Sequence, residues 1–577
     1  LMSVSQPTIR PLWDNRAMEE TLIALVDAAG DERFRFVPPA TPENPNPGPT
    51  RMSFYHFIRK VWREQVYPSA GVAADFETFW RGVLRQGVFQ SAAFRNAQAR
   101  ARTFRVESLA SLPEPGPAPE GLRLVLYRSP LHGDGSTMNN VWLLETPDPV
   151  SKIAWDNFAA ISLATAERLG LKPATEGPVY GQKVPLVELE AGGVKQRIPV
   201  HILPGTHPDV VAVMVGWGRE AVGAVGNGVG VNAFRWVRAQ EQGLVYSGLP
   251  VRITPTGEYY DLVDMQGHNY ITVKAPLVGE QHRPIIFETT LPEYRKDPKA
   301  GQEHHGPEEP MSTWKDEHPY PGHKWGMVID LNACIGCSAC MVACQAENNI
   351  AVVGKQEALR GREMHWIRID RYYSGDPANP QVVYQPMLCQ HCDYAPCETV
   401  CPVIATMHND EGLNVQIYNR CVGTRYCSNN CPYKVRRFHW FEYHQTIYTL
   451  YDQQIPSHKS QEVVSPLQLV LNPDVTVRER GVMEKCTFCI QRIREAKYVA
   501  KERGTPLRDG EVQTACQQTC PTDAIIFGDV NDPNSLVHRL RQDPRGYLVL
   551  GELNTRPAIT YYTKVRNVEE QAEGHHT

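Results

Sequence analysis

The residues best suited to chemistry are fifteen cysteines, all in the second half of the 577-residue chain. They form four groups with short, regular spacings: Cys334-x2-Cys337-x2-Cys340-x3-Cys344; Cys389-x2-Cys392-x4-Cys397-x3-Cys401-Pro402; Cys421-x2-Thr424-x2-Cys427-x3-Cys431-Pro432; and Cys486-x2-Cys489 followed by Cys516-x3-Cys520-Pro521. A C-x2-C-x2-C loop wraps three thiolates around one face of an iron–sulfide cubane, and its backbone amides point at the sulfides. The spacing therefore predicts iron–sulfur clusters and electron transfer.

The last cysteine of each run comes three residues after the one before it. In two-cluster ferredoxins this cysteine ligates the neighbouring cluster. We expect it to begin a helix that points away, with the following Pro in the first helical turn, where no backbone N–H is needed. By this analogy the second and third groups nest, and the first pairs with the fourth. The expected ligand sets are Cys334, Cys337, Cys340 and Cys520; Cys344, Cys486, Cys489 and Cys516; Cys389, Cys392, Cys397 and Cys431; and Cys401, Cys421 and Cys427.

The fourth set has only three cysteines, because Thr424 occupies the place of an expected thiolate. A corner iron without a thiolate is easily lost, so we expect three [4Fe–4S] clusters and one [3Fe–4S] cluster. A three-iron cluster usually has a higher potential than its four-iron neighbours, which suits an acceptor of electrons from a quinol. The alternative is that the Thr424 hydroxyl or a water completes a four-iron cluster.

Two other uses of the cysteines fit less well. Zinc ribbons also contain C-x2-C pairs, but they do not contain C-x2-C-x2-C-x3-C-P runs. Disulfides form in oxidising compartments. An odd total of fifteen cysteines in such dense runs disfavours them.

Composition narrows the class of protein. With 42% apolar and 21% charged residues, the chain reads as an ordinary globular protein. A formal net charge of -5 gives no reason to expect nucleic-acid binding. No run of 18 apolar residues is present, so contact with a membrane requires a partner. The N-terminus has no export signal, and Leu1 before Met2 favours a start inside a longer precursor over a cytoplasmic protein.

The chain divides into two modules, because residues 1–333 contain no Cys and all the cysteines follow them. Apolar spacing predicts helices at Ala17–Ala29, Tyr55–Val66 and Phe76–Gly87. A strand entry followed by a helix ending at Gly170 is expected in Val150–Leu169. Short strands are expected at Leu122–Tyr127, Lys183–Glu190, Arg197–Leu203 and Val210–Val215.

The segment 278–324 is polar and rich in His, Pro and Glu, and we expect a linker or a strap lying on a partner. Four of its histidines are expected to be solvated loop residues rather than metal ligands; they are His304, His305, His318 and His323.

Charged and aromatic residues also follow the cysteine groups. The set Lys434, Arg436, Arg437, Phe438, Trp440 and Phe441 fits either a docking surface for a membrane partner or an amphipathic helix with basic residues in water. The basic helix expected at Ile490–Arg503 either moderates the clusters' negative charge or, as we favour, is solvated. For Tyr372 and Tyr373, packing is preferred to electron relay.

Further motifs resemble known families. From Lys324 to Val565 the chain resembles the four-cluster ferredoxin-like subunits of molybdopterin enzymes such as polysulfide, nitrite and dimethyl sulfoxide reductases. The resemblance rests on Cys431-Pro-Tyr-Lys-Val-Arg-Arg-Phe, Lys485-Cys-Thr-Phe-Cys, Phe527-Gly-Asp-Val-Asn-Asp-Pro-Asn and Arg545-Gly-Tyr-Leu-Val-Leu-Gly-Glu-Leu. In the first module, Asn140-Val-Trp-Leu-Leu-Glu-Thr-Pro-Asp-Pro-Val and Pro204-Gly-Thr-His-Pro-Asp-Val-Val resemble the last β-barrel domain of molybdopterin oxidoreductase large subunits.

One chain carrying both modules resembles the iron–sulfur (B) subunits of bacterial alternative complex III, most of all at Leu471-Asn-Pro-Asp-Val-Thr-Val-Arg-Glu-Arg-Gly-Val-Met-Glu-Lys-Cys. The resemblance implies an α+β fold with a molybdopterin-oxidoreductase-like helical tail at 1–110 and a molybdopterin-dinucleotide-binding-like β-barrel at 120–277. The linker 278–324 and a double ferredoxin-like domain with four clusters at 325–577 follow.

The same resemblance implies a function. The chain is expected to be a peripheral subunit at the periplasmic face of the bacterial inner membrane, in a hetero-oligomeric complex. It takes electrons from menaquinol at an integral membrane quinol-binding subunit and passes them through its clusters towards c-type cytochrome subunits. No substrate site of its own and no molybdopterin are expected. The rival is a catalytic molybdopterin oxidoreductase fused to its electron-transfer module. Gly216, Gly218, Gly226, Gly228 and Gly230 could line a pterin site, but tight turns are preferred.

Overall fold

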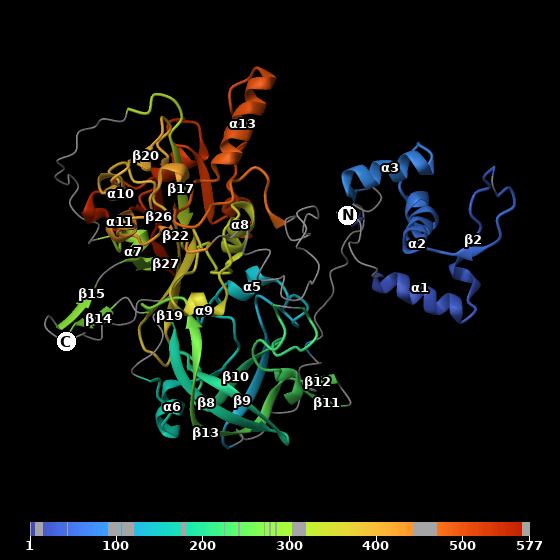
Figure 1. The fold of residues 1–577 in the computed structure, drawn as a ribbon, viewed down its shortest axis with the longest axis horizontal. Helices are drawn as coiled ribbons and strands as arrows, with labels where there is room; N and C mark the ends of the chain where they lie inside the picture. Colours follow the sequence, from blue (N-terminus) through green and yellow to red (C-terminus); the bar gives the residue numbers. More distant parts are fainter. Residues whose placement is uncertain are drawn as a thin grey trace. The chain divides into compact units, whose positions relative to one another are not determined.

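The computed structural model describes residues 2–5, 16–42, 44–90, 106, 120–174, 181–223, 225–240, 243–269, 272–275, 279–282, 285–302, 319–441 and 470–567. Two compact units divide the chain, Leu1–Ala118 and Pro119–Thr577. Both contain helices and strands, which Figure 1 colours along the sequence, so the expected mixture of α and β structure is confirmed. All fifteen cysteines lie in the second unit.

The described residues of the first unit contain three short α-helices, α1 (Met18–Ala28), α2 (Phe54–Val61) and α3 (Phe76–Gln86). Trp62, Phe79 and Trp80 form the centre of its apolar core. The expected helix over Tyr55–Val66 ends earlier as an α-helix and continues as a π-helical turn at Trp62–Val66. Two strand pairs complete the unit, β1 (Met2–Ser3) with β4 (Val88–Phe89) and β2 (Arg35–Phe36) with β3 (Thr50–Arg51).

The second unit begins with a sheet that closes on itself. Strand β5 pairs with β10, then β7, β9, β8 and β13 follow in order, and β13 returns to pair with β5. The strands are β5 (Arg123–Arg128), β6 (Ile153–Ala154), β7 (Ala159–Ile161), β8 (Gln182–Ala191), β9 (Val194–Ile202), β10 (Val210–Val215) and β13 (Ser247–Asp264). This closed circuit, called the barrel below, encloses a core that includes Val187, Val213 and Trp236. Alternating burial along β5 and along the first half of β10 matches one face turned inward.

Short helices and strand pairs surround the barrel. Helix α5 (Val141–Glu145) is capped by Asn140, and α6 (Leu163–Leu169) is capped by Ser162 and ends at left-handed Gly170, as expected. The remaining elements are β11 (Arg238–Gln240), β12 (Gly243–Val245), β14 (Thr272–Ala275) and β15 (Gly279–His282).

The cysteine-rich part is organised around a four-stranded sheet in the order β24-β17-β26-β25. Its strands are β17 (Trp325–Asp330), β24 (Ile525–Asp529), β25 (Gly546–Tyr547) and β26 (Ile559–Tyr562). Three hairpins carry the middle of the sequence: β18 (Arg368–Ser374) with β19 (Gln381–Met387), β20 (Thr406–His408) with β21 (Asn414–Gln416), and β22 (Arg437–Phe438) with β23 (Met483–Glu484). The helices are α8 (Ala339–Glu347), α9 (Lys355–Leu359), α10 (Pro396–Thr399), α11 (Tyr426–Asn430), α13 (Ile490–Arg503), α14 (Ala515–Gln518) and α15 (Leu536–Arg541).

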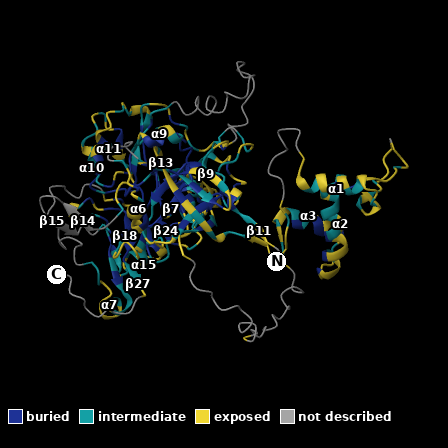
Figure 2. Ribbon diagram, turned by 90° about the horizontal axis from the view of Figure 1, so that it is seen from below, coloured by how far each residue is buried: buried dark blue, intermediate teal, exposed yellow. Residues whose placement is uncertain are grey.

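One continuous apolar core joins the barrel to the cysteine-rich part. It includes Phe158 and Trp217 of the first and Trp325 and Tyr561 of the second. Figure 2 shows buried residues concentrated in the sheets of this unit, among them β7 and β24. The two parts therefore fold as one body.

Polar contacts fix the same junction. The buried carboxylate of Glu145, at the end of α5, accepts hydrogen bonds from the backbone N–H groups of Val353 (3.0 Å) and Gly354 (2.8 Å). Lys355 Nζ lies 2.6 Å from Asp156 Oδ2 and 2.7 Å from the Tyr260 hydroxyl. The barrel thus holds the segment that follows α8, the helix carrying the first cysteines.

The described part of the expected linker packs against the rest of the unit. Strand β16 (Glu288–Thr290) pairs in parallel with β27 (Lys564–Arg566), and α7 (Leu291–Lys296) follows directly. His323 Nδ1 lies 2.6 Å from Asp529 Oδ2, so this residue is paired rather than solvated. His304, His305 and His318 lie outside the described residues.

Among the residues that the structure describes, no helix has the length and apolarity that crossing a membrane requires.

The junction leads to a prediction about pH. Burial raises the pKa of Glu145 to about 8, above the ordinary value of 4.5, despite the two backbone hydrogen bonds that favour its charge. The folded chain therefore binds this proton more tightly than the unfolded chain does. Stability should fall as the pH rises from 4.5 towards 8. The loss reaches at most about 1.4 kcal/mol per pH unit.

A Glu145→Gln variant keeps the acceptor oxygen and removes the proton. Its melting temperature, followed by circular dichroism, should fall less between about pH 6 and about pH 8.5 than that of the parent chain. Glu167→Gln on the exposed face of α6 is the control and should behave like the parent. Equal slopes for the Glu145→Gln variant and the parent would show that the carboxyl is ionised in the folded chain.

Candidate iron–sulfur centres

The first predicted set comes together at the N-terminal end of α8. Burial raises the pKa of Cys340, and the thiols of its neighbours raise it further; they are Cys516, Cys334, Cys337 and Cys520. Burial likewise raises the pKa of Cys334 to about 11, with Cys520 and Cys337 acting in the same direction. The loop Cys334–Cys340 and the distant Cys520 therefore meet around one site.

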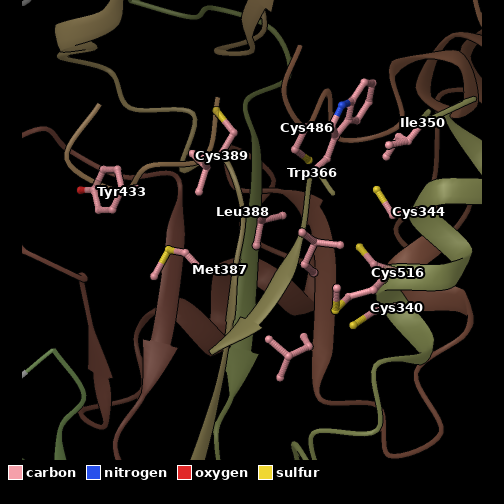
Figure 3. Close-up of a cluster of buried hydrophobic side chains, with 14 of the residues drawn as sticks. Cys340, Cys344, Ile350, Trp366, Met387, Leu388, Cys389, Tyr433, Cys486 and Cys516 are labelled. Carbon is pink, nitrogen blue, oxygen red and sulfur yellow. The ribbon is translucent and has the colours of Figure 1, made fainter. Parts of the chain in front are cut away.

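The second set lies one helical turn further along α8. Burial raises the pKa of Cys344, and so do the neighbouring thiols of Cys486, Cys489 and Cys516. In Figure 3 Cys340 and Cys344 project from α8 on the same side as Cys516. Residues far apart in sequence thus face one another.

The third set surrounds the start of α10. Burial raises the pKa of Cys392, as do the thiols of Cys389, Cys397 and Cys431. Cys397 is affected by Cys389 and Cys431 in turn, and its pKa rises to about 12, burial being the main cause.

The three cysteines of the deficient set are less enclosed. Cys401 and Cys421 are half-buried, whereas Cys427 is buried. Although burial acts to raise it, the pKa of Cys401 is lowered by the backbone N–H groups of Val403, Ala405 and Thr406 and by the charge of Arg436. The same guanidinium interacts with the Cys427 thiol.

The four groups follow one another in a row. Cys340 of the first set neighbours Cys516 of the second, and Cys486 of the second neighbours Cys389 of the third. Arg436 links Cys397 of the third to Cys427 of the deficient set. The order of the sites is therefore first, second, third, deficient, with the two end sites holding the least buried thiols, Cys337 and Cys421 among them.

The first and third cysteine loops share one backbone conformation. Gly336 and Ser338 have φ values of 71° and 64°, and Gly423 and Arg425 have φ values of 73° and 63°. Thr424 therefore occupies in its loop the place that Cys337 occupies in the other. Both positions are exposed.

Each Cys-Pro pair forms the same turn, and it is not the predicted one. Residues Ile404, Lys434 and Asp523, three positions after Cys401, Cys431 and Cys520, have left-handed φ values of 51°, 52° and 51°. At each of the three turns the next N–H group donates to the cysteine, and Val435 does so to Cys431. Ala405 N lies 3.2 Å from Cys401 Sγ, and Ala524 N lies 3.3 Å from Cys520 Sγ.

The expectation that these cysteines begin helices was therefore wrong. Helices α10, α11 and α14 end before the Cys-Pro pairs, and Cys344 lies inside α8. In this turn the backbone N–H donates a hydrogen bond to the cysteine sulfur. In a helix the same N–H would donate to a carbonyl oxygen.

Arg436 is a site residue that the sequence did not single out correctly. Its side chain is buried, Nη1 lies 3.4 Å from Cys397 Sγ, and Nη2 donates to Thr406 Oγ1 at 2.7 Å. Burial acts to lower its pKa, but the thiols of Cys397, Cys427, Cys389 and Cys431 outweigh burial and raise it. A permanent positive charge thus lies between two sites.

Lys485 is a second buried cation. Its ammonium donates to the carbonyls of Asn414 and Cys486 and lowers the pKa of Cys397 by its charge, so it lies between the second and third sites. In sequence, Arg436 and Lys485 resemble any basic residue next to a loop, and only their burial distinguishes them.

The segment after the third group does not form the expected helix. Arg437–Phe438 form β22, which pairs with β23, and Arg437 Nη1 lies 2.6 Å from Glu363 Oε1. The buried Glu484 of β23 is 2.8 Å from His439 Nδ1 and accepts from Arg478 at 2.9 Å. The amphipathic-helix interpretation of this segment is therefore wrong, because Arg437–Phe438 form a strand. The docking-surface interpretation stays a prediction, since Lys434 is exposed and Phe438, Trp440 and Phe441 are half-buried.

Other expectations are met. Tyr372 and Tyr373 are packed in the interior. The glycine-rich loop forms tight turns: Gly218 has φ 69°, and a Cβ there would lie 2.2 Å from the backbone N of Asn232. Helix α13 spans Ile490–Arg503 as expected, and most of its basic residues are exposed, although Arg492 pairs with Glu347 at 2.8 Å.

The donor chemistry fits iron–sulfur clusters. Among the described residues, no three His, Cys, Asp or Glu side chains are close enough to hold a single metal ion. A zinc site needs its ligands about 2.0–2.3 Å from one ion, whereas a cubane spreads its thiolates around a larger body. The thiols here are buried and have raised pKa values. Such groups become thiolates where bound metal supplies the balancing positive charge.

Arg436 leads to a prediction about potential. Removing its charge with Arg436→Met should favour the oxidised, less negative state of the clusters on either side, and so lower their reduction potentials. We expect a roughly tenfold change in the reduction equilibrium, about 59 mV for one electron, in redox titrations followed by electron paramagnetic resonance. Arg436→Lys keeps the charge and serves as the control. Unchanged potentials in Arg436→Met would mean that solvent, rather than the guanidinium, balances the clusters.

Comparisons with known proteins agree with this chemistry. Residues 333–405 and 380–447 each match a family described as a 4Fe-4S dicluster domain. The iron–sulfur cluster-binding subunit of menaquinone reductase from Nitratidesulfovibrio vulgaris is 42% identical over 246 residues, which cover 42% of this chain and 89% of that protein.

More distant relatives extend the same group. The iron–sulfur subunit 1 of an Hdr-like menaquinol oxidoreductase from Archaeoglobus fulgidus is 30% identical over 256 residues, covering 41% of this chain and 82% of that protein. The iron–sulfur subunit of the arsenate respiratory reductase from a Shewanella species is 32% identical over 252 residues, covering 41% and 94%. The chain therefore belongs to the family of iron–sulfur subunits that carry 4Fe-4S dicluster domains and accompany such oxidoreductases.

Proposed function

We propose that this chain is the electron-transfer subunit of a membrane-associated quinol-oxidising complex of the alternative complex III type. In this proposal it receives electrons from menaquinol at an integral membrane subunit and delivers them towards c-type haem subunits. The observation that carries the proposal is the row of four thiol sites with its two least buried sites at the ends. Bound clusters supply one-electron chemistry, and the protein positions and insulates them.

The ligand sets are part of the proposal. We assign Cys334, Cys337, Cys340 and Cys520 to the first cluster; Cys344, Cys486, Cys489 and Cys516 to the second; Cys389, Cys392, Cys397 and Cys431 to the third; and Cys401, Cys421 and Cys427 to the fourth. The thiol neighbours described above support the first three sets. The shared loop conformation supports the fourth, because it puts Thr424 where a thiolate stands in the first loop.

We infer a [3Fe–4S] cluster at the fourth site and [4Fe–4S] clusters at the others. Thr424 is exposed, so the corner of the cluster beside it faces water and lacks a thiolate to retain iron. The N–H groups around Cys401 and the charge of Arg436 lie at this site. They favour the more negative, reduced state there, which agrees with an acceptor facing a quinol.

The surface at the fourth site supports contact with an apolar partner. Ile404, Val422 and Tyr426 expose 62%, 64% and 56% of their area next to its cysteines. At the other end Ile335 exposes 57%, beside Cys334. We propose that the fourth site faces the membrane subunit and the first faces the haem subunits, with the chain held at the periplasmic face by these partners.

The barrel motivates a rival function. A closed circuit of strands fits the molybdopterin-dinucleotide-binding-like domain expected from the sequence, so a catalytic molybdopterin oxidoreductase is the alternative. Metal analysis of the purified complex separates the two. Iron without molybdenum supports the electron-transfer subunit, and about one molybdenum per chain would replace that proposal with the rival.

The three-iron assignment has its own test. The oxidised protein should show a [3Fe–4S] resonance at about g = 2. Restoring the ligand with Thr424→Cys should convert this cluster to a four-iron form, lower its potential and slow quinol oxidation.

The control for this variant is Thr399→Cys, which adds an exposed thiol after the start of α10. It should leave the resonance unchanged. Absence of the resonance from the parent protein, or unchanged turnover in Thr424→Cys after conversion, would contradict the assignment.

A further inference from the structure

A buried lysine of the barrel lies beside the first cluster site. Lys152 follows α5 and precedes β6, and only 1% of its surface is exposed. Its ammonium nitrogen has no hydrogen-bond partner among the described residues, nor do those residues offer it an ion pair within 4.0 Å. A buried ammonium without a partner is costly, so its position needs a reason.

The backbone holds this side chain in place. Lys152 has a left-handed φ of 65°, which is unusual for a residue with a side chain. Asp148 fixes the turn by accepting from the N–H groups of Val150 (3.1 Å) and Ser151 (2.8 Å), and Met265 N donates to the Lys152 carbonyl at 3.0 Å. The strained conformation and the buried charge together indicate a functional constraint.

Nearby carboxylates already have partners. Asp370 accepts from Arg368 Nε at 2.8 Å, and Asp264 accepts from Gln182 at 2.7 Å and from Gln266 N at 3.1 Å. Asp148 is occupied by its turn. The other close charge, Arg371, has the same sign as the ammonium and donates to Asn269 at 2.9 Å. Neither Asp370 nor Asp148 forms an ion pair with Lys152 within 4.0 Å, although both act on its ammonium by their charge more strongly than Cys334 does.

The remaining neighbour is the first cysteine loop. The Lys152 ammonium lies 5.6 Å from the centre of the Tyr384 ring, which is within cation–π range. The same ring also contacts Gly336, where an added Cβ would lie 2.5 Å from Tyr384 Cδ1. Cys334 acts on both Lys152 and Tyr384 by its charge. The Tyr384 ring therefore contacts both the first cysteine loop and the ammonium that the barrel supplies.

We propose that Lys152 sets the reduction potential of the cluster held by Cys334, Cys337, Cys340 and Cys520, and that supplying this charge is a function of the barrel in this chain. A positive charge in a dry interior favours the more negative, reduced state of a cluster. The inference rests on the proposed first ligand set. The barrel then has a second role besides packing, because it controls the reduction potential of the cluster at the first site.

A second lysine acts on the same cluster site from the opposite module. Lys564 of β27 is half-buried, donates to the Leu331 carbonyl at 3.1 Å and lowers the pKa of Cys334 by its charge. Exposure to solvent weakens its field, whereas Lys152 is enclosed. Lys564 therefore provides a comparison within the same site.

The test uses the full chain within its purified complex. Lys152→Met keeps the length of the side chain and removes the charge. Redox titration followed by electron paramagnetic resonance should show one four-iron centre shifted to a lower potential, with a tenfold or larger change in its reduction equilibrium, about 59 mV for one electron. Lys152→Arg should restore most of the shift, and Lys183→Met on the exposed edge of β8 should cause none.

Two further variants test the ligand set and the role of solvent exposure separately. In Cys337→Ser the same centre must change its resonance, which tests the ligand set independently of Lys152. Lys564→Met should shift this centre less than Lys152→Met does. An unshifted centre in Lys152→Met with full iron content would overturn the inference and leave Lys152 as a counter-charge for the carboxylates. If Lys152→Met loses the centre, Lys152→Gln is judged by the same criterion.

Discussion

The structure depends on balancing the negative charge of many thiolates within one apolar core. Ten of the fifteen cysteines are buried, and burial together with neighbouring thiols raises the pKa of most of those. Iron supplies most of the balancing charge, and the protein supplies the rest as N–H groups and buried cations. The turns after Cys401 and Cys520 aim an N–H at the sulfur, while Arg436 and Lys485 lie between successive sites. Positive charge is therefore placed between neighbouring sites as well as next to the cysteine ligands.

The same requirement explains how distant segments come together. Each end site has a loop with a left-handed residue on either side of its second ligand position, and Cys520, from a far segment of the chain, lies near Cys334 of the first loop. The four-stranded sheet and the core shared with the barrel bring these segments close together. The barrel is part of this arrangement rather than a separate appendage, because Glu145, Asp156 and Lys152 all reach the cysteine-rich part.

Local patterns were the most predictable from sequence. Helix α13 and strand β10 have the bounds that periodicity predicts, and Gly170 ends α6 as its conformational freedom suggests. The Cys-Pro turns were mistaken for helix starts, because helix rules consider backbone hydrogen bonds to oxygen and neglect those to sulfur. Arg436 and Lys152 were missed or misassigned for a different reason. Whether a basic residue is solvated or buried beside a thiolate depends on contacts between segments that no local pattern contains.

The central claim is that fifteen cysteines hold four clusters in one row, the last with three ligands. Anomalous scattering at the iron edge from crystals of the complex measures this directly. Within this chain it should give four iron peaks in the order of the proposed sets, and the peak beside Thr424 should be a three-iron cluster with three cysteine ligands. Fewer peaks, or a peak whose ligands come from a different combination of cysteines, would contradict this arrangement.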